Sequence, residues 1–117
     1  MKPTDLMIKD WVMVKVLSQI PNTYVLHTWT ANDYSRDLQV KPIPLTTEIL
    51  EKNGWKYTTY CHEYQYGKNT IQCRLPYMVG RINGIDIENF KCEYVHQYQH
   101  LLRLCGLNEL ANNFKVV

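Results

Sequence analysis

The most informative stretch of this 117-residue chain reads Pro42-Ile43-Pro44-Leu45-Thr46-Thr47-Glu48-Ile49-Leu50-Glu51-Lys52-Asn53-Gly54-Trp55. Its pattern predicts a short helix with a marked beginning. Thr46 can cap the first turn through its hydroxyl. Leu45 and Leu50 occupy the two positions of a hydrophobic staple, in which an apolar residue before the cap packs on one in the second turn.

The end of this helix is marked as clearly. Gly54 is the residue type that ends a helix in left-handed conformation, and Trp55 follows at the position that packs back on Leu50 in a Schellman ending. Pro42 and Pro44 keep the preceding chain extended and prevent an earlier start. The stretch is therefore expected to join one β segment to another.

The chain before this stretch predicts antiparallel strands. Residues 11–17 and 24–29 are rich in β-branched and aromatic residues, with the turn signal Pro21-Asn22 between them. The polar run 30–37 is expected to be an exposed loop. Residues 38–43 then form a third strand that leads into the helix.

The chain after it predicts a three-stranded meander over residues 57–92. If Gly67-Lys68 is a two-residue type II′ loop, Tyr64 faces Ile71 and the hairpin has one apolar and one polar face. Pro76 interrupts the middle strand, and we expect the strand to continue after it through a bulge.

The second hairpin of this meander has the strongest turn signal in the chain. Asn83-Gly84 favours a tight turn that sets Ile82 opposite Ile85 and Arg81 opposite Asp86.

A second helix is predicted over residues 93–104, ending at Gly106. Its apolar stripe consists of Tyr94, Val95, Tyr98, Leu101, Leu102 and Cys105. The opposite side carries His96, Gln99, His100 and Arg103, which we expect to form a solvated face. Residues 114–117 are expected to add a terminal strand.

Length and composition limit the possible functions. We expect residues 1–117 to form a single α+β domain. The formal net charge is only +2 with scattered basic residues, so the chain lacks the positive footprint of a dedicated duplex binder. Apolar runs are far shorter than the ~20 residues that span a bilayer, and no signal segment is apparent. We therefore expect a cytoplasmic protein without a membrane partner.

The cysteines support the same compartment. Cys61, Cys73, Cys92 and Cys105 include no C-x-x-C pair. We expect buried free thiols rather than a disulfide framework.

Three stretches of the sequence resemble a family of small uncharacterised proteins from Bacteroides-type gut bacteria and their mobile elements. They are Asp5-Leu6-Met7-Ile8-Lys9-Asp10-Trp11-Val12, the stretch 42–54, and Tyr94-Val95-His96-Gln97-Tyr98-Gln99. The chain departs from the family at two places: Lys9-Asp10 replaces Gly-Asn in the first segment, and Tyr98 replaces an aliphatic residue in the third. The resemblance implies a shared fold with SH3-like N-terminal strands, and it implies no activity.

The clearest chemical candidate is a metal site on the second helix. Glu93, His96 and His100 are three and four residues apart, so a helix would place a carboxylate and two imidazoles along one strip. Gln97 stands where a zinc protease has its general base. A solvated helix face explains the same residues, so we expect no metal and no cofactor.

Two other constellations have simpler explanations. His62 opposite Cys73 could form a nucleophile pair, but both are expected on the apolar side of a hairpin. Tyrosines near Lys68 and Arg74 could stack on single-stranded nucleic acid. We expect Tyr60, Tyr64 and Tyr77 to face the core instead, so only a loose fringe of Tyr57 and Tyr66 remains.

Apolar residues at expected surface positions indicate protein contact. Leu104 falls on the polar side of the second helix, and Trp29, Tyr34 and Arg36 surround the predicted exposed loop. Our leading hypothesis is a non-enzymatic interaction or accessory module that binds a protein partner or self-associates. The alternatives are a nucleic-acid-binding accessory protein of a mobile element and, third, a metal-dependent enzyme.

Overall fold

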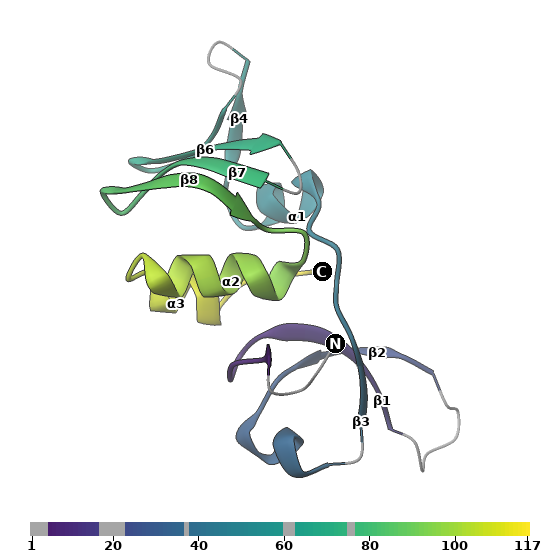
Figure 1. Cartoon of the computed structure of the whole chain (residues 1–117). Coiled ribbons are helices and arrows are strands. Elements are labelled where there is room, and N and C mark those ends of the chain that lie inside the picture. Colours follow the sequence, from purple (N-terminus) through teal and green to yellow (C-terminus); the bar gives the residue numbers. More distant parts are fainter. Residues whose placement is uncertain (1–4, 17–22, 37, 60–62, 75–76) are drawn as a thin grey trace.

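The computed structural model describes residues 5–16, 23–36, 38–59, 63–74 and 77–117, with the side chains of Val16, Cys73 and Arg74 left aside. Within these residues the strands form one three-stranded and one five-stranded antiparallel sheet, accompanied by short helices (Figure 1). The α+β class predicted from the sequence is confirmed. The molecule is elongated, with extents of 51 × 24 × 22 Å.

The smaller sheet is formed by β1 (Trp11–Val16), β2 (Val25–Thr28) and β3 (Leu38–Lys41), in the order β2-β1-β3. The predicted antiparallel strands are confirmed, while their SH3-like character remains a prediction. The segment predicted as an exposed loop contains a 3-10 helix, η2 (Ala31–Ser35), and a buried Asp33. The predicted exposure is confirmed for the other described residues of this run and is wrong for Asp33, which is held in a buried position by local hydrogen bonds described below.

The helix α1 (Thr47–Lys52) begins and ends as its sequence predicts. Thr46 Oγ1 accepts a hydrogen bond from the Ile49 amide at 3.3 Å. At the other end, Gly54 has φ +87°, and the Trp55 amide donates to the Leu50 carbonyl at 3.2 Å. This is the hydrogen-bond pattern of a Schellman ending.

The larger sheet has five strands where we predicted three. They are β4 (Lys56–Thr58), β5 (Glu63–Tyr66), β6 (Asn69–Arg74), β7 (Tyr77–Ile82) and β8 (Ile85–Lys91), paired in sequence order. Arg74 pairs with Tyr77 and Thr58 with Glu63, so the chain reverses direction at both places. The strand predicted to continue past Pro76 therefore folds back on itself. The first two predicted strands are each two short ones, and the third is the single strand β8.

Both predicted hairpin registers are confirmed. Tyr64 pairs with Ile71, and Gly67 has φ +59° as the first loop residue. Ile82 pairs with Ile85 and Arg81 with Asp86 across the Asn83-Gly84 turn.

The helix α2 (Val95–Leu104) lies across one face of the five-stranded sheet, and the short α3 (Asn108–Asn112) packs beside it (Figure 1). The C-terminal residues 114–117 do not form the predicted strand. Phe114 and Val116 are buried instead, because they complete the apolar layer around α2.

Apolar side chains gather in two clusters rather than one. The larger cluster lies between the five-stranded sheet and the helices, and Trp11 and Met13 of β1 pack against it. The smaller cluster, inside the N-terminal part, comprises Leu6, Val12, Val14 and Trp29. That residues 1–117 form a single domain remains a prediction.

Candidate functional site

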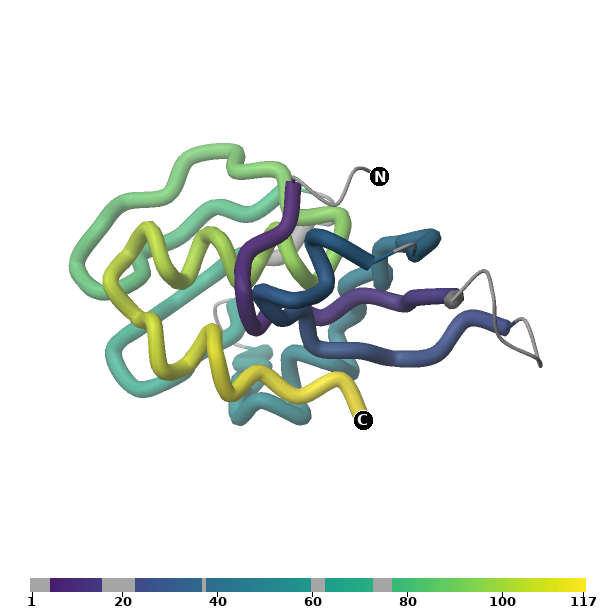
Figure 2. The backbone as a smooth tube through the Cα atoms, turned by 90° about the horizontal axis from the view of Figure 1, so that it is seen from below, coloured from purple at the N-terminus to yellow at the C-terminus, as the bar shows by residue number. Residues whose placement is uncertain are grey.

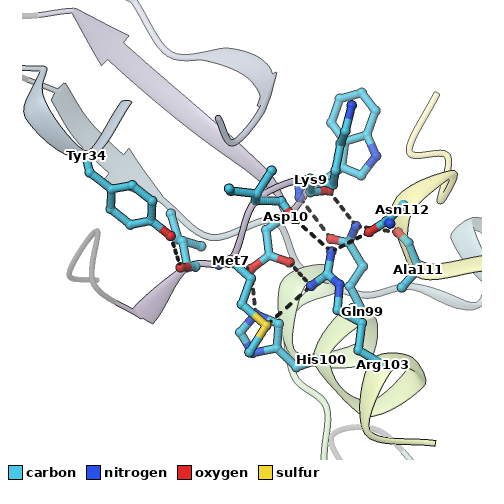
Figure 3. Close-up of polar contacts among 12 residues, drawn as sticks. Met7, Lys9, Asp10, Tyr34, Gln99, His100, Arg103, Ala111 and Asn112 are labelled. Carbon is cyan, nitrogen blue, oxygen red and sulfur yellow. Dashed lines mark hydrogen bonds and ion pairs between the residues drawn. The ribbon is translucent and has the colours of Figure 1, made fainter. Parts of the chain in front are cut away.

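A buried polar joint connects the N-terminal part of the chain to α2 (Figure 3). Asp10 is fully buried, and its carboxylate contacts Arg103 Nη1 at 2.6 Å and His100 Nε2 at 2.5 Å. The Met7 amide donates to the same carboxylate at 2.8 Å. These contacts satisfy a charge that would otherwise be costly to bury.

Gln99 makes the second half of the joint. Its side chain is fully buried, with Oε1 accepting from the Trp11 amide and Nε2 donating to the Lys9 and Ala111 carbonyls, each at 2.9 Å. One amide side chain therefore connects β1, α2 and α3.

The predicted solvated face of α2 is thus wrong. Gln99 and His96 are buried, and His100 and Arg103 are half-buried, because this face packs against residues 7–11. The apolar stripe uses the opposite side of the same helix. Asp10 carries the charge opposite to that of Arg103, so the sequence contains both partners. Because they are 93 residues apart, no local pattern predicts that they pair.

The metal-ligand set proposed from spacing is not assembled. Glu93 lies near Lys91, at 3.8 Å, while His100 is bound to Asp10. The rings of His96 and His100 do lie edge to face, with centroids 5.7 Å apart. Among the described residues, no three His, Cys, Asp or Glu side chains are placed to hold one metal ion.

His96 lines an open hollow of about 460 Å³ at the beginning of α2. Its walls are Asp5, Pro42, Tyr94, His96, Gln97 and His100. Burial lowers the pKa of His96, and the charge of Asp10 offsets this only in part, so the ring is neutral at pH 7. Nδ1 of His96 is buried and finds no partner in the described part of the chain, so it is not presented to a ligand.

Three of the predicted binding residues gather around η2, where they serve the fold. Trp29 is fully buried, and Tyr34 packs edge to face on it with ring centroids 5.5 Å apart. Tyr34 donates its hydroxyl to the Leu6 carbonyl at 2.6 Å, and Arg36 pairs with Asp33 at 3.1 Å. Trp29 is therefore unavailable to a partner, whereas Tyr34 and Arg36 keep exposed surface.

Asp33 is the centre of this group. Burial alone would raise its pKa, but hydrogen bonds from His27 and Thr30 outweigh that effect and lower the pKa to about 2. The His27 ring lies 2.6 Å from the carboxylate. A buried, ionised aspartate of this kind orders the chain between β2 and β3.

Leu104, the fourth predicted binding residue, is 71% exposed on α2, as expected. No described contact connects it with Trp29, Tyr34 or Arg36, which belong to the other half of the molecule. The predicted binding set is therefore not one surface.

The prediction that Tyr77 faces the core is wrong. Tyr64 is buried as predicted, but Tyr77 is exposed because β7 reverses relative to β6. Tyr57 and Tyr66 pack their rings on Tyr64 and Trp55, respectively. Tyr60, His62 and the Cys73 side chain lie outside the described residues.

The feature that sequence reasoning missed is the outer edge of β2. Three consecutive apolar residues are exposed at its beginning: Tyr24, directly before the strand, by 39%, Val25 by 55% and Leu26 by 41%. β2 pairs with β1 on one side, and no described strand pairs with its other side. We call these three residues, together with Lys15 and Lys41, the β2 edge surface. Figure 2 shows this end of the sheet projecting away from the helices.

Other sheet edges carry features that discourage pairing with another chain. β3 ends in Lys41 and is followed by Pro42, β4 has only three residues, and β8 contains Asp86 and Glu88. β8 also has a register shift against β7. Charges, prolines and bulges protect edges, whereas the four residues of β2 include no proline, lysine, arginine or acidic residue.

The backbone of β2 is oriented for pairing. Trp29, directly after β2, donates its amide to the Asp10 carbonyl and accepts from the Lys9 amide, each at 2.8 Å, so both groups point to the side on which β1 lies. Backbone groups alternate sides along a strand, so Leu26 and Thr28 direct theirs to the open edge. These are the groups that an added strand would meet.

Tyr24 is flanked by two cations. The ammonium of Lys15 lies 5.2 Å and that of Lys41 5.7 Å from the centre of its ring. Cations over an aromatic face are attracted by its quadrupole. The β2 edge surface therefore combines apolar side chains, open backbone groups and positive charge.

No protein-family model, curated protein or solved structure matches the chain. The family resemblance of the sequence therefore remains a prediction. Within the described residues, no helix has the length and apolar character needed to cross a bilayer.

Proposed function

We propose that this chain is a non-enzymatic, cytoplasmic interaction module that binds a partner protein by accepting an extended segment of it as a fourth strand beside β2. The observation that carries the proposal is the unprotected β2 edge, where Tyr24, Val25 and Leu26 are exposed. Strand addition obtains affinity from backbone hydrogen bonds and specificity from alternating side chains. At this edge the backbone groups of Leu26 and Thr28 are open, and the side chains of Val25 and Leu26 are exposed.

The cytoplasmic location has separate support. Cys105 is a buried free thiol, and burial raises its pKa, which keeps it protonated and unreactive. Free cysteines are typical of reducing compartments.

Backbone pairing can be tested with one proline. Leu26→Pro removes an amide that points to the open edge, so it leaves the pairing with β1 intact. Peptides selected from a random 12-residue display library on the full chain should bind wild type and lose binding to Leu26→Pro. Leu26→Ala, which keeps the amide, is the matched control and should retain much of the binding.

Two results would contradict the proposal. One is equal binding of the selected peptides to wild type and to a folded Leu26→Pro variant. The other is a set of amide shifts in nuclear magnetic resonance (NMR) spectra that centres on the hollow near His96 rather than on Leu26 and Thr28.

Single-stranded nucleic acid is the second candidate, favoured by Tyr24 between two lysines. Stacking of a base needs an open ring face, and here ammonium groups already lie over the ring. Fluorescence anisotropy with an oligo-dT 12-mer at low salt tests it directly. A salt-sensitive complex that requires Tyr24 would favour this candidate over strand addition.

A further inference from the structure

The charge at the β2 edge surface indicates what kind of segment fits it. The three strands of the smaller sheet contain Lys15 and Lys41 and no aspartate or glutamate. In the described part of the chain neither lysine forms an ion pair, although both ammonium groups lie near one tyrosine ring. Two like charges held together in this way favour an anionic neighbour.

On this basis, and resting on the proposed function, we infer that the partner segment is acidic opposite Tyr24 and apolar opposite Val25 and Leu26.

Sheet geometry places the acidic position. Leu26 pairs with Met13, and Met13 pairs with Lys41, so these side chains share one face of the sheet. Tyr24, directly before β2, lies on that face too, because the ammonium groups of Lys15 and Lys41 lie over its ring. An added strand would run about 4.8 Å beyond β2. A glutamate beside Tyr24 could therefore reach the ammonium groups that lie over its ring.

The apolar positions follow from the same alternation. The residue opposite Leu26 lies on the lysine face, and the residue opposite Val25 lies on the other face. Because Val25 and Leu26 are about half exposed, apolar neighbours on both faces would remove their surface from water.

A second copy of this chain fits less well. Antiparallel pairing of two β2 edges would bring two Lys15 and two Lys41 side chains onto one continuous sheet. These lysines lie on β1 and β3, so they would not be directly opposed, but they would repel one another and meet no carboxylate in the strands of either small sheet. The acidic segment of a different protein is therefore the occupant that the charges favour.

A designed peptide tests this inference on the full chain. Thr-Glu-Val-Ile-Val-Glu-Thr places an acidic residue at either end of an apolar run, so it satisfies the pattern in both strand directions. Versions with Gln or Lys in place of both Glu residues are the charge controls. Binding is followed by NMR through the amides of Leu26 and Thr28 at two salt concentrations.

We expect the Glu peptide to bind about tenfold more tightly than the Gln peptide at low salt, with the difference shrinking at high salt. The double variant Lys15→Gln/Lys41→Gln should abolish this preference. The matched double variant Lys56→Gln/Lys68→Gln, which neutralises two exposed lysines of the other sheet, should keep it.

The outcomes separate the two proposals. If Glu and Gln peptides shift the Leu26 amide equally, strand addition stands and the acidic preference fails. If no peptide shifts it, strand addition itself fails. Concentration-dependent dimerisation with the same shifts would replace the acidic partner with a second copy, and shifts caused only by oligo-dT would replace it with nucleic acid.

Discussion

Arg103 on α2 donates a hydrogen bond to Asp10, 93 residues earlier in the chain, across a buried 2.6 Å contact. This pair, with His100, holds the N-terminal sheet against the helix. Removing one member of a buried ion pair leaves the other uncompensated. The joint should therefore be essential for stability, whatever the chain binds.

Asp10→Ala should lower the free energy of unfolding by about 3–5 kcal/mol, because Arg103 and His100 would lose their buried partner. Urea unfolding followed by tryptophan fluorescence measures the loss. Asp86→Ala is the matched control: it removes an Asp–Arg contact with Arg81 in which both side chains are largely exposed, so it should cost much less. Equal losses for the two variants would mean that the joint is not buried as described.

The contact between Asp10 and α2 is a part of the fold that could not be predicted from the sequence. Local signals predicted what local chemistry determines, including the Thr46 cap, the Gly54 ending and the register around Asn83-Gly84. The polar face of α2 is different, because its partner comes from residues 7–11. Periodicity reveals the apolar stripe of this helix, but it cannot reveal a second, polar partner so far along the chain.

The proposed binding surface at the β2 edge could not be predicted for a related reason. Residues 24–29 were predicted as a strand, but a sequence does not say which strand lies at an edge. Exposure of Tyr24, Val25 and Leu26 follows from the order β2-β1-β3, which only tertiary pairing establishes. Trp29, predicted at the surface, is buried, and its ring packs against that of Tyr34 in η2.

Asp33 makes the N-terminal part sensitive to acid. Its pKa is lowered from 3.8 to about 2 in the folded chain, so its contribution to stability is complete above about pH 4 and is lost as the pH falls through 2. The contribution is about 2 kcal/mol. Comparing urea unfolding of wild type and Asp33→Asn from pH 5 to pH 2 should show the difference between them vanishing. A difference that stays constant over this range would argue against the shifted pKa.

Lys9 occupies a backbone conformation that favours glycine. Its φ is +76°, in the bulge where Lys9 and Asp10 both bond to Trp29. The left-handed conformation costs a residue with a side chain about 1–2 kcal/mol. Glycine avoids this cost, but its greater freedom in the unfolded chain offsets part of the gain. Lys9→Gly should thus be more stable than Lys9→Ala by about 1 kcal/mol in urea unfolding, since both lose the same side chain. If alanine proves as stable as glycine, the turn differs from this description.

Gly80 provides the sharpest test of the five-stranded sheet. It pairs with Ile71 on the neighbouring strand, and a Cβ atom added there would lie 2.0 Å from the Thr70 carbonyl oxygen, a backbone atom that cannot move aside. Gly80→Ala should therefore cost at least about 3 kcal/mol or prevent folding, as seen by circular dichroism. In the three-stranded meander predicted from sequence, residues 71 and 80 would lie far apart on one long strand, and alanine would be tolerated.

Gly67→Ala is the control for this prediction. Nothing lies within 4 Å of its added Cβ, so only its φ of +59° opposes the change, at about 1 kcal/mol. A Gly80→Ala protein no less stable than Gly67→Ala would contradict the reversal of the chain between β6 and β7.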